Sequence, residues 1–103
     1  MNALAALADP TRQRIVETLA LGALTSGEIA RRFPVSAPAI SQHLKTLREA
    51  RLVTVRGEAQ RRIYALDKTG VDEVARWIEN VQAFWAPKLD ALEAALLEDN
   101  CHE

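Results

Sequence analysis

The sequence predicts a mainly α-helical fold with a small β-hairpin, and three observations support this. Two helical patterns, at residues 25–33 and 36–50, are separated by about three residues, which is the spacing of a helix-turn-helix. Residues 53–66 then alternate between apolar and polar side chains on both sides of Gly57, as a hairpin does. A long apolar repeat over residues 70–98 exceeds what one small domain needs to cover itself. Together these patterns indicate a winged helix-turn-helix that forms a homodimer through its N- and C-terminal helices.

The length and composition indicate one soluble domain. The chain has 103 residues, of which 49% are hydrophobic and 26% are charged. We expect a single domain over residues 1–103, with the core and wing at 9–66 and dimerisation helices at 1–8 and 70–98. No apolar run approaches the ~20 residues of a membrane span, and no basic leader precedes an apolar core. We therefore expect a cytoplasmic location and no membrane partner. The only cysteine, Cys101, excludes an intrachain disulfide.

The first two helices are recognised by their spacing and capping residues. The stretch NALAALA predicts a short helix with Leu4 and Leu7 on one side. Asp9 is placed to cap the next helix, and Pro10 suits its first position, where a backbone N–H would have no helical partner.

The helix-turn-helix also has clear boundaries. Thr25 and Glu28 fit a capping box, in which each side chain accepts a hydrogen bond from the other residue's backbone N–H. Pro34 stops this helix, and Ser36 caps the following one, which carries Pro38 in its first turn.

The hairpin follows directly. Val53 and Val55 mark its first strand, and Ile63, Tyr64 and Leu66 lie in its second. Arginines stand at the base of the loop between the strands, so the predicted wing is basic.

The final helix carries an apolar stripe at steps of three and four residues. Pro87 is its one breaker and should kink or divide the helix near Ala86. One interpretation is that the stripe packs against its own domain. We expect instead that it pairs with a second copy of the chain, together with the N-terminal helix. The predicted interface consists of Leu4, Leu7, Trp77, Ile78, Val81, Phe84, Trp85, Leu89, Leu92 and Leu96.

The net charge of -1 conceals a separation of charge along the chain. Residues 1–66 hold ten basic and five acidic side chains, whereas residues 67–103 hold three basic and nine acidic ones. The basic excess is concentrated in residues 31–62. A domain of this kind can present a positive surface to a polyanion although it is nearly neutral overall.

The helix at residues 36–50 has an exposed face that fits the major groove of DNA. Ile40, Leu44 and Leu47 define its buried side. The opposite face carries small and hydrogen-bonding side chains, which let a helix approach base edges closely. Gln42 is the best candidate to read a base, since glutamine can pair with the N6/N7 edge of adenine.

Basic side chains around this face are expected to bind phosphates and to set the register on DNA. Glu58 at the wing tip is unfavourable there unless the tip splays away or Arg56 or Arg61 offsets its charge. His43 lies at the edge of the buried stripe, so packing competes with base reading as its role. We expect Arg12 to cap or pair within the domain. The predicted DNA contacts are Ser36, Pro38, Ala39, Ser41, Gln42, His43, Lys45, Thr46, Arg56, Arg61 and Arg62.

Three segments in this order resemble the ArsR/SmtB family of bacterial winged-helix repressors: LADPTRQRIVETLA, EIARRFPVSAPAISQHLKTLREARLV and RRIYALD. The resemblance covers roughly residues 3–97. It implies a homodimer whose terminal helices pair, with two recognition helices in successive major grooves of an inverted-repeat operator. It also implies that the operator commonly lies in the regulator's own promoter and that an effector releases the DNA.

The resemblance does not extend to the metal sites of that family. Metal-sensing members carry a Cys-rich pattern in the helix before the turn, where this chain reads GEIARRF. Another family site pairs Asp and His across the C-terminal helices, but this helix has no histidine before His102. We therefore expect no metal and no cofactor. A metal or redox switch in the tail stays open as an alternative, through Asp99, Cys101, His102 and Glu103.

Two other classes of function compete with a DNA-binding repressor. A winged helix can serve as a protein-interaction module, but such a face should be more apolar and aromatic than this one. An enzyme is not indicated, because the sequence contains two histidines and one cysteine, with no Gly-rich phosphate loop and no nucleophile–base pair.

Overall fold

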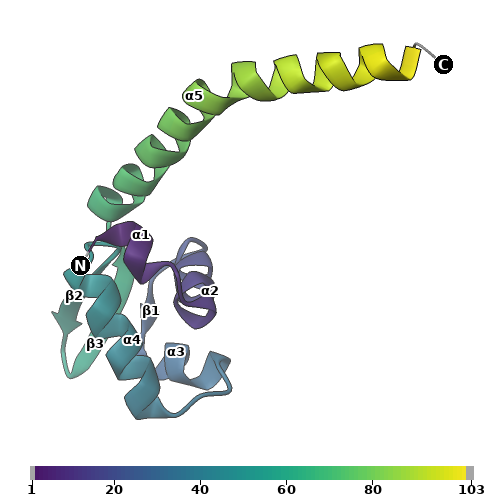
Figure 1. Cartoon of the computed structure of the whole chain (residues 1–103). Coiled ribbons are helices and arrows are strands. Elements are labelled where there is room, and N and C mark those ends of the chain that lie inside the picture. The colour runs from purple at the N-terminus through teal and green to yellow at the C-terminus, as the bar shows by residue number, and fades with distance from the viewer. Residues whose placement is uncertain (1, 102–103) are drawn as a thin grey trace.

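The computed structural model describes residues 2–101, and the side chains of residues 2–98. In this part of the chain, helices α3 and α4 form the helix-turn-helix and strands β2 and β3 form the wing, which confirms the predicted mainly helical winged helix-turn-helix (Figure 1). The elements in order are α1 (Ala3–Ala6), α2 (Pro10–Leu19), β1 (Leu24–Thr25), α3 (Ser26–Arg32), α4 (Ala37–Glu49), β2 (Val53–Glu58), β3 (Arg61–Leu66) and α5 (Lys68–Cys101).

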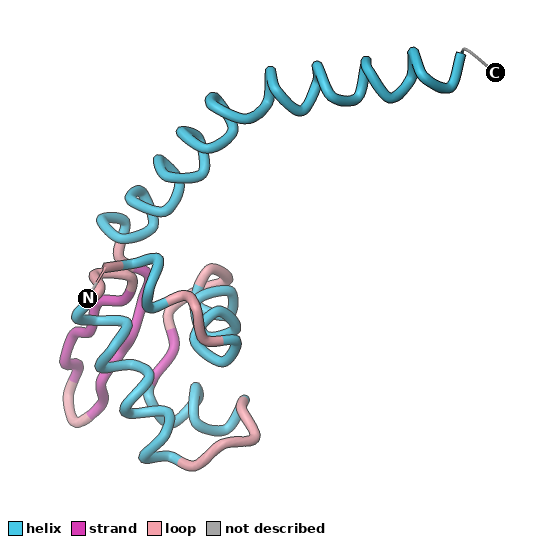
Figure 2. Tube along the Cα trace, in the orientation of Figure 1, coloured by secondary structure: helices cyan, strands magenta, loops and turns pink. Residues whose placement is uncertain are grey.

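The wing belongs to a three-stranded antiparallel sheet in the order β1-β3-β2 (Figure 2). The sequence does not predict β1, because a strand of two residues has no alternation to recognise. Its residues pair with Tyr64 and Ile63 of β3. Since α3 begins directly after β1, this pairing holds the start of the helix-turn-helix against the wing.

The turn of the wing lies beyond Gly57. Glu58 and Arg61 are the last paired residues of the two strands, so Ala59 and Gln60 form a two-residue loop. Ala59 has a φ of 57°, a left-handed conformation that tight hairpin turns require. Gly57 itself lies within β2, opposite a residue of β3.

The core is built around the buried side of α4. Ile40, Leu44 and Leu47 expose at most 2% of their surface, which confirms the side predicted from their spacing. They pack in one cluster with Ile15 of α2 and Ile29 of α3. The opposite side of α4 is therefore left facing outward.

The predicted capping residues begin three of the helices. The Oδ2 atom of Asp9 accepts a hydrogen bond from the N–H of Arg12 at 3.0 Å, and Ser36 caps α4 in the same way at 3.2 Å. Thr25 and Glu28 form the predicted capping box of α3, with hydrogen bonds of 3.1 and 2.9 Å.

A Schellman-type turn ends α4 and leads into the wing. The N–H of Leu52 donates to the carbonyl oxygen of Leu47, and the N–H of Arg51 donates to that of Arg48, both at 3.0 Å. Arg51 has the left-handed conformation that this turn requires, with a φ of 59°. Leu52 is buried in the core, which anchors the start of the wing.

Helix α5 projects away from the rest of the molecule (Figure 1). Val71 and Val74 pack against the core, but the helix continues to Cys101. The molecule measures 69 × 27 × 23 Å, and its radius of gyration is 19.4 Å, whereas a compact chain of this length has about 13 Å. Pro87 lies inside α5 and does not divide it; Figure 1 shows instead a bend in the middle part of the helix. A proline bends a helix because it lacks a donor and clashes with the preceding turn.

Candidate nucleic-acid interface

The exposed side of α4 carries most of the side chains that the sequence predicts for DNA contact. Opposite the buried stripe, the exposed side chains of the helix include short polar groups, the cation Lys45 and the carboxylate Glu49, and none of them is bulky and apolar. The oxygen of Ser36 already accepts the capping hydrogen bond of the helix. The exposed members of the predicted set on this helix and its cap are Ser36, Pro38, Ser41, Gln42 and Lys45, and the half-buried ones are Ala39, His43 and Thr46.

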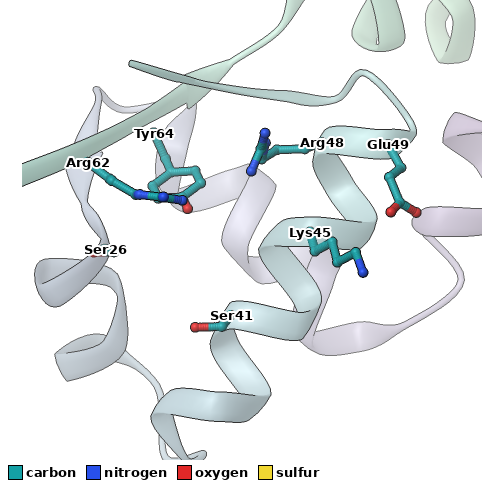
Figure 3. Close-up of a pocket in the computed structure, with 7 residues that line it drawn as sticks. All are labelled: Ser26, Ser41, Lys45, Arg48, Glu49, Arg62 and Tyr64. Atoms are coloured by element: carbon teal, nitrogen blue, oxygen red, sulfur yellow. The ribbon is translucent and has the colours of Figure 1, made fainter. Parts of the chain in front are cut away.

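A groove of about 650 Å³ lies beside this face, between α4, α3 and β3. Ser41 and Arg48 line it from α4, Arg62 and Tyr64 from β3, and Ser26 from the start of α3 (Figure 3). In Figure 3 the side chain of Arg48 extends from α4 toward β3. Lys45 and Glu49 complete the lining.

A second groove, of about 720 Å³, continues along the start of α3 to the wing tip. It shares Ser26 and Arg62 with the first, so the two grooves adjoin, and we call them together the basic groove. The cations that line it outnumber the carboxylates by five to two, which favours a polyanion. The cations are Lys45, Arg48, Arg62, Arg31 and Arg61, and the carboxylates are Glu28 and Glu49.

The carboxylate of Glu28 forms hydrogen bonds within the protein. It accepts hydrogen bonds from the backbone N–H of Thr25 and, with a smaller effect, from the hydroxyl of Thr25. These hydrogen bonds hold the pKa of Glu28 below its usual value. This carboxylate stays at the N-terminus of α3, where it complements the unpaired backbone donors of the first turn.

Besides the acidic residue Glu49, three residues that line the first part of the basic groove are missing from the predicted DNA contacts: Ser26, Arg48 and Tyr64. Arg48 lies seven residues, or about two helical turns, after Ser41, so helical spacing alone could have found it. Ser26 and Tyr64 reach the groove because β1 pairs with β3, and no local sequence pattern predicts that pairing.

The wing carries the remaining predicted arginines on its exposed surface. Arg61 and Arg62 line the basic groove, whereas Arg56 lies outside it and forms an ion pair with Glu58 at 3.5 Å. This pair confirms that Arg56 offsets the acidic residue of the wing. Because both side chains are exposed, the pair is weak and leaves Arg56 free to exchange partners.

His43 is turned toward α2. Its Nδ1 atom lies 3.3 Å from Nη1 of Arg12 and 4.0 Å from Oδ2 of Asp9. The hydrogen bond from the backbone N–H of Arg12 lowers the pKa of Asp9 against the opposing effect of partial burial, and the charge of Arg12 acts in the same direction. The expectation that Arg12 pairs within the domain is confirmed.

The outer part of α5 carries a long row of exposed apolar side chains. Trp77, Phe84 and Leu89 expose 51%, 58% and 59% of their surfaces, so this chain alone does not cover them. The interpretation that the whole stripe packs on its own domain is therefore wrong. The large exposed apolar residues on this helix are Trp77, Ile78, Phe84, Trp85, Leu89, Leu92, Leu96 and Leu97, and Leu97 is not among those predicted from the sequence.

The other predicted interface residues are less exposed. Val81 is half-buried, as are Leu4 and Leu7 on α1. Leu7 also packs against the hydrophobic core, so part of its surface has an intramolecular role.

Within residues 2–98, no three histidine, cysteine or acidic side chains gather closely enough to hold a metal ion. The suggested tail ligands Asp99, Cys101, His102 and Glu103 lie outside the described side chains. None of the described helices is sufficiently long and apolar to cross a membrane.

Known proteins resemble this chain in both sequence and fold. Residues 7–56 match the model of a family described as "Helix-turn-helix domain". The chain is 52% identical to the HTH-type transcriptional regulator Rv2034 of Mycobacterium tuberculosis over 84 residues, which span 82% of this chain and 76% of the relative. It is 35% identical to the transcriptional repressor SdpR of Bacillus subtilis, over 77% of this chain and 88% of that protein.

Solved structures agree with these relatives. A structure of an ArsR family transcriptional regulator superposes with a TM-score of 0.73 at 27% identity, covering 82% of this chain and 87% of the other. An ArsR-like transcriptional regulator from Rhodococcus sp. RHA1 gives a TM-score of 0.70 at 31% identity, over 86% and 84% of the two chains. The chain belongs to the ArsR family of winged helix-turn-helix proteins, which are DNA-binding transcriptional regulators and not enzymes.

Proposed function

We propose that this protein is a repressor that binds an inverted-repeat operator as a homodimer. The observation that carries the proposal is the pairing of two surfaces: the exposed face of α4, which has short hydrogen-bonding side chains, and the basic groove beside it. The first surface suits base edges in a major groove, and the second suits the phosphates that flank it.

Base reading is assigned to the exposed face of α4. Gln42 has an exposed amide that can donate to and accept from one adenine edge. Ser41 and Thr46 flank it with hydroxyl groups, and Pro38 and Ala39 keep the first turn narrow enough to approach the bases. His43 contributes less to base reading, because its Nδ1 atom faces Arg12.

Phosphate binding is assigned to the cations of the basic groove and the wing. Lys45, Arg61 and Arg62 come from two elements and line the adjoining parts of the basic groove, so they can contact a DNA backbone that passes between α4 and the wing. Arg56 joins them when its weak pair with Glu58 opens. Such contacts orient the protein without reading sequence.

The homodimer is assigned to the terminal helices, residues 1–8 and 70–98, with residues 9–66 as the DNA-binding core and wing. An apolar stripe of this length left exposed on a projecting helix is typical of a protein–protein interface. A second copy is the occupant that covers it with an identical stripe. Its two-fold symmetry would then place two α4 helices on two half-sites.

Repression is the regulatory outcome that we assign to this binding. The Bacillus subtilis relative is a transcriptional repressor, and a third relative, 40% identical over 80% of this chain, is the biofilm growth-associated repressor of Agrobacterium fabrum. A dimer that occupies promoter DNA represses by excluding other proteins from it. The operator in the protein's own promoter is the first to test.

The deciding experiment is fluorescence anisotropy with the DNA upstream of the protein's own gene. A scrambled duplex of equal length and composition serves as control, at about 0.15 M salt, where specific and non-specific binding separate. Tight binding to the upstream DNA alone supports the proposal. Equal, weak binding to both duplexes contradicts a specific operator at that location.

A further inference from the structure

Arg12 joins three helices, and the proposed function does not use it. Its backbone N–H is bonded to Asp9 at the start of α2. Its Nε atom donates to the carbonyl oxygen of Ala6, the last residue of α1, at 2.6 Å. Its Nη1 atom lies 3.3 Å from Nδ1 of His43 on α4. The guanidinium group therefore bridges α1 and the recognition helix α4.

The chemistry of arginine determines which side chain donates in the hydrogen bond between Arg12 and His43. An arginine side chain has only donors, so this hydrogen bond requires the tautomer in which Nδ1 of His43 accepts and Nε2 carries the ring proton. The side chain of His43 is 21% exposed, so water competes with this hydrogen bond only in part. Asp9 lies 4.0 Å from the same nitrogen, which is too far for a hydrogen bond.

The hydrogen bond at His43 restrains the rotation of α4, which the apolar contacts of the core do not. Ile40, Leu44 and Leu47 hold α4 by apolar contacts, which do not depend on direction and tolerate a small rotation of the helix. A rotation about the helix axis would shift Gln42, the neighbour of His43, relative to the base edges. Hydrogen bonds are strongly directional, so the link to Arg12 opposes that rotation.

The other end of the link reaches the dimer helices. Ala6, which accepts from Arg12, belongs to α1, and α1 contacts both α5 and α4. We propose that Arg12 is a positioning residue that holds α4 in one orientation relative to α1 and so couples the dimer helices to the DNA-reading face. This inference rests on the proposed function for the role of α4, but its structural part can be tested without DNA.

The first test compares Arg12→Met with Arg14→Met in the full-length protein. Methionine keeps much of the side-chain length and removes every donor, and Arg14 lies on the same helix with its guanidinium over the ring of Phe33 instead. Amide hydrogen exchange without DNA should accelerate about tenfold between Ile40 and Leu47 in the first variant alone. Equal acceleration at Ile15 in α2 would indicate general destabilisation and overturn the proposal.

The second test measures DNA binding of the same two variants. Arg12→Met should weaken binding to the operator duplex about tenfold and leave binding to the scrambled duplex unchanged. Its dependence on salt should match that of the unmodified protein, because Arg12 neutralises no phosphate. If the binding constant of the variant depended less steeply on salt concentration, Arg12 would be a phosphate contact, and its positioning role would be overturned.

Variants at the other end of the link keep the test decisive if Arg12→Met does not fold. His43→Leu removes the acceptor and should reproduce the local exchange, whereas His43→Gln offers an amide oxygen to Arg12 and should restore most protection. Equal exchange in both variants would overturn the proposal. If the unmodified protein binds operator and scrambled DNA equally, the proposed function fails, and hydrogen exchange still decides whether Arg12 positions α4.

Discussion

The backbone N–H of Gly70 donates to the carbonyl oxygen of Arg51 at 2.7 Å, which joins the first turn of α5 to the loop after α4. The backbones approach so closely that a Cβ atom at position 70 would overlap the Arg51 carbonyl group and the nitrogen of Leu52. The long helix therefore starts from a contact that only glycine permits.

Gly70→Ala should destabilise the fold by roughly 1–3 kcal/mol, because the overlapping atoms are backbone and α5 must shift to relieve the clash. Thermal unfolding followed by circular dichroism measures this. Gly57→Ala is the matched control, since a Cβ there meets nothing within 4 Å. Equal stabilities of the two variants would contradict the close contact at Gly70.

Gln42→Ala should cost roughly 1–3 kcal/mol of operator binding and relax specificity at one base position, because it removes a paired donor and acceptor. Anisotropy titrations against operator duplexes, each substituted at one position, measure both effects. A similar loss on scrambled DNA would argue against base reading by Gln42.

Arg62→Ala should weaken binding to all duplexes and lower the salt slope by about one, as expected when one phosphate contact is lost. Arg62 lies where the two parts of the basic groove meet. Arg76→Ala removes the same charge from the exposed surface of α5 and should leave the slope unchanged. A loss confined to the operator would instead make Arg62 a base reader.

Asp9→Asn should reveal a pH-dependent contribution to stability. The pKa of Asp9 is lowered in the folded protein, so its carboxylate stabilises the fold above the unfolded pKa of about 3.9, and this is lost as pH falls through the lower folded value. Asparagine still caps α2 without the charge. The Tm of the unmodified protein should exceed that of the variant near neutral pH, with the gap closing below about pH 4. A gap independent of pH would contradict a charge effect.

Leu92→Glu should dissociate the proposed dimer, because it places a charge within the exposed apolar stripe of α5. Asp90→Lys changes charge on the opposite side of the same helix and should leave the dimer intact. Sedimentation velocity over a range of concentrations measures both. A monomeric unmodified protein would refute the dimer itself.

Features that depend on neighbouring residues could be predicted more accurately than those that depend on distant ones. The capping residues of α2, α3 and α4 and the buried stripe of α4 were predicted correctly, because each depends on residues within a turn or two of one another. The effect of Pro87 could be predicted only as a bend or a break. In the structure α5 continues through Pro87. Whether a proline bends or breaks a helix depends on whether the turn before it can bend while the helix on both sides stays continuous.

By itself the sequence determined where helices and wing strands form, which side of α4 is buried, and that the chain resembles winged-helix repressors. Local hydrogen bonds and apolar spacing act over a few residues, and so they can be read directly. Only the tertiary structure decided that β1 joins the sheet, that Ser26, Arg48 and Tyr64 line one groove, and that Arg12 bridges α1 and α4. These features unite residues far apart in the chain, and their geometry follows from how the elements pack.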